Sequence, residues 1–235
     1  MKIGLIGKGQ MGTLVESLGK ARGHEVVLEI RAADSDLSAA ELRRRLSKAD
    51  VVIDFSVAGV VRRNVEACVQ AGVPIVEGTT GWNAESDEIE RIVLDGGGSM
   101  VFGANFSIGV NLFYRIADFA AELFSRFTEY EVFIEEQHHS RKKDAPSGTA
   151  LKLKETVARH ITNDFGVAST RAGNIPGTHR VGFDGPADQI LLEHTARSRE
   201  GFAAGALMAA EWIVGKKGFY EFGDVVDEIC QNREQ

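Results

Sequence analysis

The sequence is poor in cysteine. Its two cysteines, Cys68 and Cys230, lie far apart and have no neighbours at the spacing of metal ligands. A disulfide framework needs several cysteines, and structural zinc sites usually place theirs in short pairs. Neither kind of site is therefore expected, and both residues are predicted to be unreactive, buried thiols.

Long apolar runs and an excess of positive charge are missing as well. No stretch approaches the roughly 20 apolar residues that a membrane-spanning helix needs, and no charged leader precedes the first apolar run. The formal net charge is −7, which argues against non-specific binding to nucleic acid. We therefore expect a cytoplasmic protein with neither a membrane nor a nucleic-acid partner.

The first hundred residues alternate between short apolar runs and amphipathic segments. The apolar runs are nearly continuous, and parallel strands need crossover connections of about a dozen residues. This pattern predicts a Rossmann-like, doubly wound parallel sheet with helices on both faces. The expected strands are 2–7, 25–30, 51–55, 73–77 and 100–102.

The pattern changes after Asn105. A long apolar helix is expected at 110–124, followed by a strand at 129–136, a loop, and a helix that begins after Ser147. Strands at 180–183 and 189–198 and a helix at 202–214 complete a second, α+β domain. We expect residues 1–106 to form the first domain, completed by 215–235, and residues 107–214 to form the second.

A GxGxxG turn joins the first strand to the first helix. Glycines in this position let the backbone approach a pyrophosphate at a helix N-terminus, so the turn predicts dinucleotide binding. A tight turn without a ligand is the less favoured interpretation in this context. The candidate cofactor-binding residues of the turn are Gly7, Lys8, Gly9, Gln10, Met11 and Gly12.

The end of the second strand bears on the choice of cofactor. A carboxylate there accepts hydrogen bonds from the ribose 2′-hydroxyl of NAD, whereas an arginine pairs with the 2′-phosphate of NADP. This strand ends with the sequence Glu29-Ile30-Arg31. Arg31 is the candidate contact and favours NADP slightly, Glu29 leaves NAD open, and a solvated Arg31 without a ligand is an equal alternative.

Small polar turns follow the fourth and fifth strands. Ligands of open α/β sheets bind beyond the carboxyl ends of the strands, so both turns are candidates to hold the nicotinamide end of a cofactor. Glycine and threonine are also common in loops for conformational reasons alone. The candidate residues are Gly78, Thr79 and Thr80 in the first turn and Gly103, Ala104, Asn105 and Phe106 in the second.

The loop 137–150 brings acid–base groups, cations and a helix start together. Ser147 is a candidate helix cap, and the backbone N–H groups of Gly148 and Thr149 would then favour a carboxylate. His138 or His139 could deliver a proton near neutral pH, while Lys142 supplies a fixed positive charge. The loop therefore predicts a site for a small dicarboxylate.

The loop has two other interpretations. An isolated His-His pair is more often a solvated strand end, but the helix cap and Lys142 favour a site. A metal is not expected, because adjacent residues on a strand point to opposite faces and no carboxylate or cysteine lies at a helpful spacing. His24, His160, His179 and His194 look isolated, and structural or surface roles are expected for each.

The sequence resembles the 4-hydroxy-tetrahydrodipicolinate reductase family, also called dihydrodipicolinate reductase, along its whole length. The most specific segment is 136–150, with Glu, two histidines, a basic run and Asp-Ala-Pro-Ser-Gly-Thr-Ala. Further matching segments are 7–12, 77–81, 104–111 and 171–173.

The resemblance implies roles for individual residues. It implies His138 as the proton donor and acceptor, Lys142 as the catalytic cation, and His139, Gly148 and Thr149 as ligands of the substrate carboxylates. It also implies NADPH or NADH as cofactor and a homotetramer assembled through the sheet of the second domain. The sequence departs from the family at Ser140-Arg141, where relatives often have Arg-His, in a glycine turn one residue shorter than in some members, and at Arg31, near an often acidic position.

Two other functions stay open on the residues alone. One is another amino-acid-related dehydrogenase acting on an aldehyde or a 2-oxo acid, which would share the cofactor site. The other is a redox-sensing regulator that binds a dinucleotide without catalysis. A regulator would leave the loop 137–150 without a purpose, and the sequence has no recognisable DNA-binding segment.

Overall fold

The computed structural model describes residues 1–34 and 37–231. The chain divides into two compact units. The first contains Met1–Ile108 together with Arg199–Gln235, and the second contains Gly109–Ser198.

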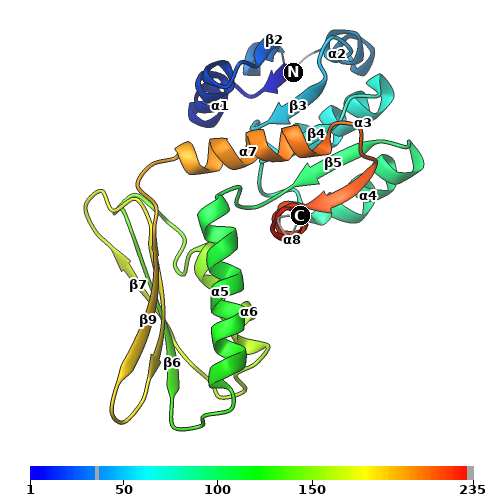
Figure 1. Ribbon diagram of the computed structural model, residues 1–235. Coiled ribbons are helices and arrows are strands. Elements are labelled where there is room, and N and C mark those ends of the chain that lie inside the picture. Colours follow the sequence, from blue (N-terminus) through cyan, green and yellow to red (C-terminus); the bar gives the residue numbers. More distant parts are fainter. Residues whose placement is uncertain (35–36, 232–235) are drawn as a thin grey trace. The chain divides into compact units, whose positions relative to one another are not determined.

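A six-stranded parallel sheet forms the centre of the first unit (Figure 1). Its strand order is β10-β5-β4-β3-β1-β2, so the predicted doubly wound parallel sheet is confirmed. The strands are β1 (Lys2–Ile6), β2 (Glu25–Ile30), β3 (Val51–Asp54), β4 (Ile75–Glu77), β5 (Ser99–Phe102) and β10 (Gly218–Glu221).

Helices cover both faces of this sheet because successive side chains of each strand point to opposite sides. On β3, Val51 and Ile53 pack into one apolar cluster with helices α1, α7 and α8, whereas Val52 packs into the other with α2, α3 and α4. The α-helices are α1 (Gln10–Ala21), α2 (Ala39–Leu46), α3 (Val61–Ala71), α4 (Ser86–Asp95), α7 (Glu200–Ile213) and α8 (Phe222–Gln231). Three short 3₁₀ helices are η1 (Ala32–Asp34), η2 (Ala58–Val60) and η3 (Asn83–Glu85).

Local sequence signals set several helix ends. Helix α2 begins with a capping box, since the Ser38 side chain accepts from the Glu41 N–H while the Glu41 carboxylate accepts from the Ser38 N–H. Helix α3 ends at Gly72, whose φ of 69° is the left-handed conformation that glycine adopts without strain.

The boundary between the units differs from the one expected after Val214. Helix α7 packs on α1 and on strands of the parallel sheet, and it therefore belongs to the first unit with β10 and α8. Gly205 permits this packing, because a Cβ atom there would lie 1.8 Å from the Phe106 carbonyl oxygen. The apolar helical pattern predicted the helix but carried no information about which sheet it covers.

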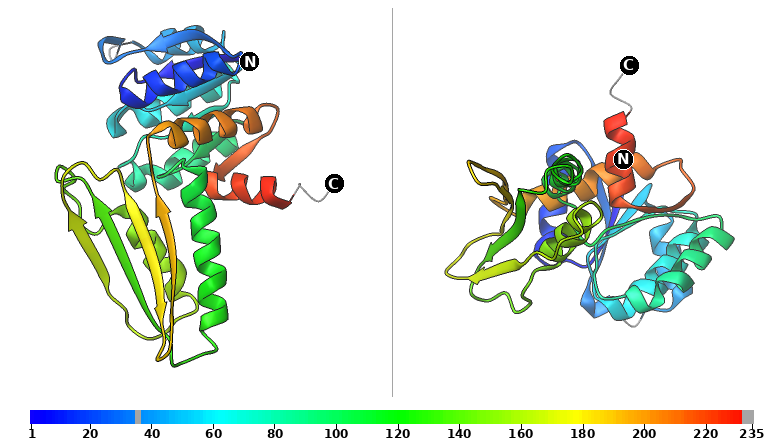
Figure 2. Two further views of the ribbon diagram at one scale, coloured as in Figure 1. Left: turned by 60° about the vertical axis from the view of Figure 1, so that its left-hand side comes forward. Right: turned by 90° about the horizontal axis from the view of Figure 1, so that it is seen from below.

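The second unit is a mixed four-stranded sheet with two helices on one face (Figure 2). The strand order is β7-β6-β8-β9, in which β7 is parallel to β6 and the other pairs are antiparallel. The strands are β6 (Glu131–His138), β7 (Val167–Arg171), β8 (Thr178–Asp184) and β9 (Gln189–Thr195), and the helices are α5 (Ile108–Phe124) and α6 (Gly148–Ala158).

Strand β7 was missed by the sequence analysis. Its three central residues, Ala168, Ser169 and Thr170, are exposed, so the segment has no apolar alternation that would mark a strand. Strand β6 runs two residues further than expected, to His138. The extension matters because residues two apart on a strand share a face, which places Glu136 beside His138.

The face of this sheet that is opposite α5 and α6 carries partly exposed apolar side chains. Phe133 lies over its cross-strand partner Gly182, where a Cβ atom would come within 2.2 Å of the ring. Leu191 of β9 is the register partner of Gly182, so it lies on the same face, and it is 46% exposed. Elsewhere, none of the helices in the described part of the chain combines the length and hydropathy needed to cross a bilayer.

Candidate functional site

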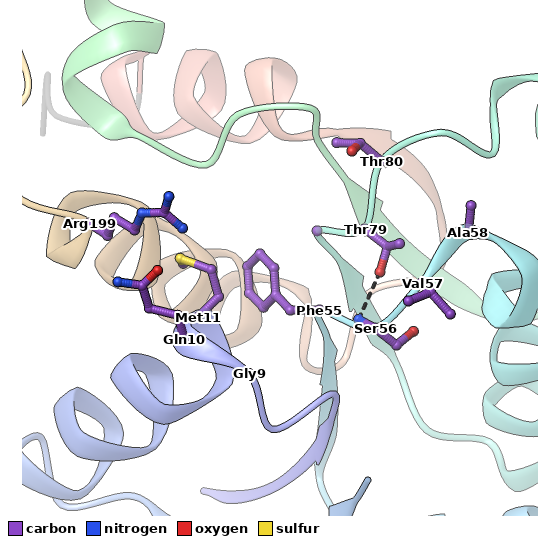
Figure 3. A pocket seen from close by; sticks show the side chains of 11 residues that line it. Gly9, Gln10, Met11, Phe55, Ser56, Val57, Ala58, Thr79, Thr80 and Arg199 are labelled. Atoms are coloured by element: carbon purple, nitrogen blue, oxygen red, sulfur yellow. Dashed lines mark hydrogen bonds between the residues drawn. The ribbon is translucent and has the colours of Figure 1, made fainter. Parts of the chain in front are cut away.

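A cavity of about 470 Å³ opens at the carboxyl ends of the parallel strands (Figure 3). It lies where β1 has β2 on one side and β3 on the other, which is the point where chain order reverses and where ligands of open α/β sheets bind. The cavity is lined by Gly9, Gln10, Met11, Phe55, Ser56, Val57, Ala58, Gly78, Thr79, Thr80 and Arg199.

The glycines of the first turn have different functions. Gly7 has a φ of 84°, and a Cβ atom there would lie 2.2 Å from the Phe55 carbonyl oxygen; one on Gly12 would lie 2.1 Å from the Gly7 carbonyl oxygen. These two glycines let the backbone fold tightly. A Cβ on Gly9 would meet no protein atom within 4 Å, so Gly9 leaves open space at the edge of the cavity.

The turn suits an anionic group. Helix α1 begins at Gln10, and its N-cap Gly9 provides no side chain to accept from the first N–H groups. Such groups and the positive end of the helix favour a phosphate or pyrophosphate. The residues present therefore fit a nicotinamide dinucleotide.

Hydrogen bonds tie together the turns after β3 and β4. The Ser56 N–H donates to Asp54 Oδ1 at 2.8 Å and to Thr79 Oγ1 at 3.0 Å. The Thr79 N–H donates to Glu77 Oε1 at 2.7 Å. Two buried carboxyl groups thus fix the polar turns that line the cavity.

Five lining residues were not among the predicted ones. Phe55, Ser56, Val57 and Ala58 follow a strand end just as 78–80 do, so the rule that selected those residues could have found them. Arg199 immediately precedes α7, far away in sequence, and no pattern near it points to a ligand.

Two predicted cofactor residues of the first unit engage in ion pairs. The Lys8 ammonium contacts both Glu16 and Glu29. The Arg31 guanidinium lies 2.7 Å from Glu29 Oε2, although its side chain is 63% exposed. Neither residue lines the cavity, and Glu29 is neutralised from two sides.

The predicted segment 103–106 contributes no lining residue to the described cavity. The Phe106 side chain is buried in the core, with ring centroids 4.7 Å from Phe222 and 6.2 Å from Phe55. Asn105 Oδ1 accepts a hydrogen bond from the Ser107 N–H and stabilises the turn. The structure therefore gives Phe106 a packing role that its position in a polar turn did not indicate.

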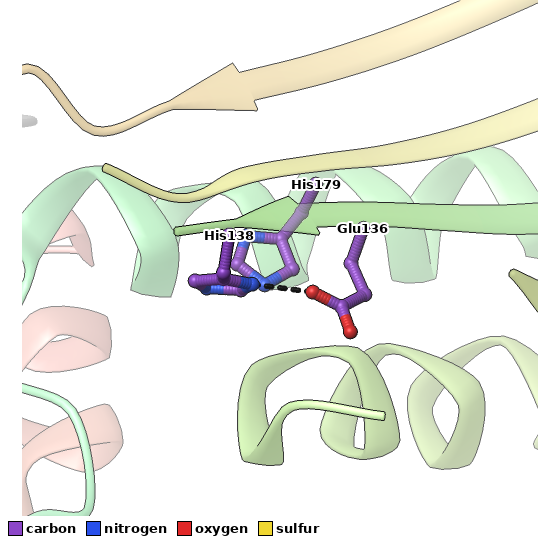
Figure 4. A group of neighbouring side chains, drawn as sticks. All are labelled: Glu136, His138 and His179. Carbon is purple, nitrogen blue, oxygen red and sulfur yellow. Dashed lines mark hydrogen bonds and ion pairs between the residues drawn. The ribbon is translucent and has the colours of Figure 1, made fainter. Parts of the chain in front are cut away.

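A buried ion pair organises the candidate site of the second unit (Figure 4). Glu136 Oε2 contacts Nδ1 of His138, and the two carboxylate oxygens accept from Arg171 at 2.6 and 2.9 Å. The Ser147 N–H also donates to Glu136 Oε1, at 3.3 Å. Glu136 thus joins the end of β6, the end of β7 and the start of α6.

The same contacts set the charges of this pair. Burial by itself would raise the pKa of Glu136, but hydrogen bonds from Arg171, Ser169 and His138 lower it to about 2. Burial lowers the pKa of His138 below its usual value, and the nearby Lys142 and Arg171 add to this, while Glu136 opposes it. Because Nδ1 faces Glu136, Nε2 of His138 is the nitrogen left to exchange a proton with a ligand.

His179 also belongs to this cluster, contrary to the isolated role expected for it. Its ring packs edge-on against His138, with centroids 5.1 Å apart. Ser147 Oγ accepts from the Ala150 N–H and lies 3.0 Å from His179 Nε2, so its own proton is free to be donated to that nitrogen. Burial and the neighbouring His138 lower the pKa of His179 to about 4, which keeps it neutral.

The cluster contradicts the expectation that no carboxylate lies at a spacing suitable for a metal ligand. Glu136, His138 and His179 have potential ligand atoms within 4.8 Å of one another, so a carboxylate does lie at a helpful spacing, two residues before His138. Both oxygens of Glu136 already accept from the Arg171 guanidinium. That positive charge disfavours a cation, and the geometry suits an anionic ligand better.

The remaining predicted residues lie on the loop that follows β6. His139 is half-buried, and its Nδ1 receives no hydrogen bond within the described structure. The Lys142 ammonium pairs with Asp144 at 2.8 Å. Ser147 caps α6 as expected, and Gly148, the first helical residue, is exposed, with open space where a Cβ would be.

Sequence reasoning did not single out Glu136 and Arg171, the two residues at the centre of this site. Glu136 could have been found from the two-residue period of a strand, since it must share a face with His138. Arg171 stands in a segment that matched the family, but without strand β7 nothing indicated that it reaches Glu136.

A dinucleotide-type cavity on a doubly wound sheet, together with a histidine–carboxylate pair in an α+β unit, defines the class of two-domain nicotinamide-dependent oxidoreductases. Family models described as dihydrodipicolinate reductase, N-terminus, and dihydrodipicolinate reductase, C-terminus, match residues 1–106 and 109–226. The chain belongs to the dihydrodipicolinate reductase family, which uses a nicotinamide cofactor.

Individual relatives agree with this assignment. The chain is 34% identical to a 4-hydroxy-tetrahydrodipicolinate reductase of Christiangramia forsetii, over 99% of this chain and all of the relative. It is 36% identical to one of Archaeoglobus fulgidus, over 93% and 96% of the two chains. A dipicolinate-bound dihydrodipicolinate reductase from Paenisporosarcina sp. TG-14 shares the fold, with a TM-score of 0.79 at 22% identity, over 96% and 99% of the chains.

The open space at Gly9 leads to a specific expectation. Gly9→Ala should keep the free energy of unfolding within about 1 kcal/mol of the wild type, because the new methyl group meets no protein atom. It should weaken NADPH binding by about tenfold or more, because the methyl group occupies the backbone's approach to the ligand. Chemical denaturation and fluorescence titration with NADPH measure the two effects.

Gly166→Ala is the matched control, since a Cβ there also meets no atom within 4 Å but lies in the second unit. It should change neither quantity. Unaltered NADPH affinity in Gly9→Ala would show that the dinucleotide does not bind against this turn.

Proposed function

We propose that the protein is an NAD(P)H-dependent 4-hydroxy-tetrahydrodipicolinate reductase of the diaminopimelate route to lysine. The reaction converts 4-hydroxy-tetrahydrodipicolinate, NAD(P)H and a proton to tetrahydrodipicolinate, NAD(P)⁺ and water. The observation that carries the proposal is the buried Glu136–His138 pair in a chain that also has a dinucleotide-type cavity. The family to which the chain belongs supplies the identity of the substrate.

His138 is the proposed proton donor. A bound NAD(P)H would supply the hydride for a carbon–nitrogen double-bond system, and the reduced product needs one proton in addition. The contact with Glu136 fixes the orientation of the ring and stabilises its protonated form, so that Nε2 can donate. Arg171 keeps Glu136 ionised, because the guanidinium lowers the pKa of that carboxyl group.

The loop after β6 is proposed to hold the two carboxylates of the substrate. The N–H groups of Gly148 and Thr149 stand at the start of α6, where the helix dipole favours an anion. His139 adds a ring nitrogen, and Lys142 adds a positive charge that would have to leave Asp144 or be shared with it. The dipicolinate bound to the reductase from Paenisporosarcina is likewise a small dicarboxylate.

The cofactor preference is proposed to be slightly in favour of NADPH. Lys8 and Arg31 both pair with Glu29, which reduces the repulsion that a lone carboxylate would exert on a 2′-phosphate. Arg31 is exposed enough to turn from Glu29 towards such a phosphate. The acceptor oxygens of Glu29 also suit the 2′-hydroxyl of NADH, so activity with both cofactors is expected.

The rival functions account for fewer of the observations. Another amino-acid-related dehydrogenase would use the same cavity but not explain a family match over both domains. A regulator that binds a dinucleotide without catalysis would have no use for a buried carboxylate that holds a histidine in one orientation. A cytoplasmic location stays a prediction.

One assay tests the function directly. The condensation product of pyruvate and aspartate semialdehyde is supplied, and oxidation of NADPH and NADH is followed by absorbance. We expect oxidation of both cofactors, faster with NADPH, and a loss of turnover by about 100-fold or more in His138→Gln, because general acid catalysis is removed. Absence of oxidation with either cofactor would reject the function, and an undiminished rate in His138→Gln would place the proton donor elsewhere.

The Glu136–His138 contact leads to a pH dependence. Protonated His138 is the active acid, so kcat/KM should fall as the pH rises through its pKa, which burial places below the usual histidine value in the free protein. Glu136→Gln removes the charge that raises this pKa, so the fall should shift to lower pH and kcat should decrease by about 100-fold. Profiles of kcat/KM against pH measure both changes.

Glu135→Gln is the control, since Glu135 neighbours Glu136 on β6 but pairs with Arg180 instead of His138. Its profile should match the wild type. The proposed orienting role is wrong if Glu136→Gln and Glu135→Gln give the same profile.

We propose a homotetramer assembled through the helix-free face of the second unit's sheet. Phe133 and Leu191 give this face apolar area that a single chain leaves partly in water. Light scattering after size-exclusion chromatography should give four times the mass of one chain, and Leu191→Glu should lower it because a charge would be buried. A wild-type protein that runs as a monomer at all concentrations would contradict this assembly.

A further inference from the structure

Two carboxyl groups are completely buried beneath the cavity of the first unit. Asp54 ends β3 and Glu77 ends β4, and they are direct partners in the register of these parallel strands. Both are 0% exposed. Ionised carboxylates are rarely buried unless a positive charge or several donors compensate for the lost hydration.

The hydrogen bonds divide unequally between the two groups. Asp54 Oδ1 accepts from the Ser56 N–H at 2.8 Å, and Asp54 Oδ2 accepts from the Asn64 amide at 2.7 Å. Glu77 Oε1 accepts from the Thr79 N–H at 2.7 Å, whereas no donor in the described structure reaches Oε2. The two carboxyl groups are neighbours across the strands and interact electrostatically, and a hydrogen bond between them would require a proton on one of them.

The surroundings provide little positive charge. Helix α3 contributes Asn64 and the buried thiol of Cys68, and the guanidinium of Arg63 reaches the oxygen of Asn64 at 3.0 Å. The register partners on the flanking strands are apolar, Ile6 on β1 and Phe102 on β5. The hydrogen-bond donors that the described structure places on the pair, the N–H groups of Ser56 and Thr79 and the Asn64 amide, are neutral.

The charges follow from this environment. Burial raises the pKa of Glu77 well above its usual value, and the nearby Asp54 raises it further. Burial also raises the pKa of Asp54, although its donors oppose the shift. Asp54 has the more complete set of donors, so it is the group that ionises first.

We propose that Asp54 and Glu77 share a single proton and act as a positioning pair for the cofactor-binding turns. Glu77 donates its carboxyl proton to the Asp54 carboxylate. Its other oxygen holds the Thr79 N–H, and Asp54 holds the Ser56 N–H. This inference rests on the proposal that the cavity binds a dinucleotide.

The shared proton is needed because of where the pair lies. The Ser56 N–H also donates to Thr79 Oγ1, so one hydrogen-bonded chain runs from Asp54 through both turns to Glu77. Loss of the proton would place two negative charges side by side without a cation, and their repulsion would separate the turns. It would also add negative charge beneath an anionic ligand.

The test uses the whole protein and the variant Glu77→Gln, whose amide can still donate to Asp54 and accept from Thr79 but cannot ionise. In the wild type, the Kd for NADPH should be constant around neutral pH and then rise by up to about tenfold per pH unit above the pKa of the pair. In Glu77→Gln the alkaline rise should be absent, because the amide cannot ionise. Glu88→Gln, an exposed change on α4, should keep the wild-type profile.

Two further measurements do not depend on cofactor binding. Infrared spectra of the wild type should contain the carbonyl band of a protonated carboxyl group at neutral pH, and this band should be missing from Glu77→Gln. A carboxyl group whose pKa is higher in the folded than in the unfolded state makes the protein less stable as the pH rises from the unfolded-state pKa to the folded-state pKa. The wild type should therefore become less stable relative to Glu77→Gln across that range.

The outcomes separate the two proposals. If NADPH does not bind at all but the band and the stability difference are present, the pair is correct and the cofactor assignment is wrong. If the wild type lacks the band, the shared proton is rejected, even when Glu77→Gln fails to fold. Identical pH profiles of Kd in wild type and Glu77→Gln would reject the positioning role.

Discussion

A carboxyl group taken out of water must be matched by donors, and this requirement shapes the candidate sites of both units. In the first unit, Asp54 and Glu77 accept the N–H groups of Ser56 and Thr79 and so fix the turns around the cavity. In the second, Glu136 accepts from Arg171 and Ser147 and contacts His138. In each case the strand carries the carboxyl group inside, and the adjacent turn has to fold so that its donors point towards it.

The two regions solve the same problem with different chemistry. Glu136 is paired with the Arg171 guanidinium, which keeps the carboxylate charged. Its pKa is lowered to about 2 despite the burial. Asp54 and Glu77 have neutral donors, so burial dominates and raises both pKa values. A charged carboxylate suits a residue that stabilises a protonated histidine, whereas a shared proton suits residues that lie beneath an anionic ligand.

Much of the fold could be predicted because the strands of the parallel sheet are short, apolar and separated by helical periods. The capping box at Ser38, the left-handed Gly72 and the cap at Ser147 are local signals, and the structure contains all three. Strand β7 had no such signal, since an exposed edge strand needs no apolar side chains. The helix at 202–214 was expected in the second domain, but α7 packs on the first sheet. An amphipathic pattern shows that one face of a helix is buried but not which sheet covers that face.

The residues of the candidate sites also differ in whether local sequence could indicate them. Gly9 and Thr79 follow strand ends, so their place at the edge of the cavity could be predicted from the sequence. Arg171 and His179 reach the cluster from other strands, and only the register of the mixed sheet brings them there. Phe106 stood in a predicted cofactor turn, but packing against Phe222 took its side chain into the core.

The return of the chain to its first sheet has a consequence for how the protein is made on the ribosome. The second unit is continuous from Gly109 to Ser198, so all of its strands and helices are available before the chain ends. The first strands of the parallel sheet are synthesised early. The sheet is complete only after α7 covers one face and β10 pairs with β5. Until these last segments emerge, an apolar sheet face and an open strand edge stay exposed, and both are features that favour misassembly.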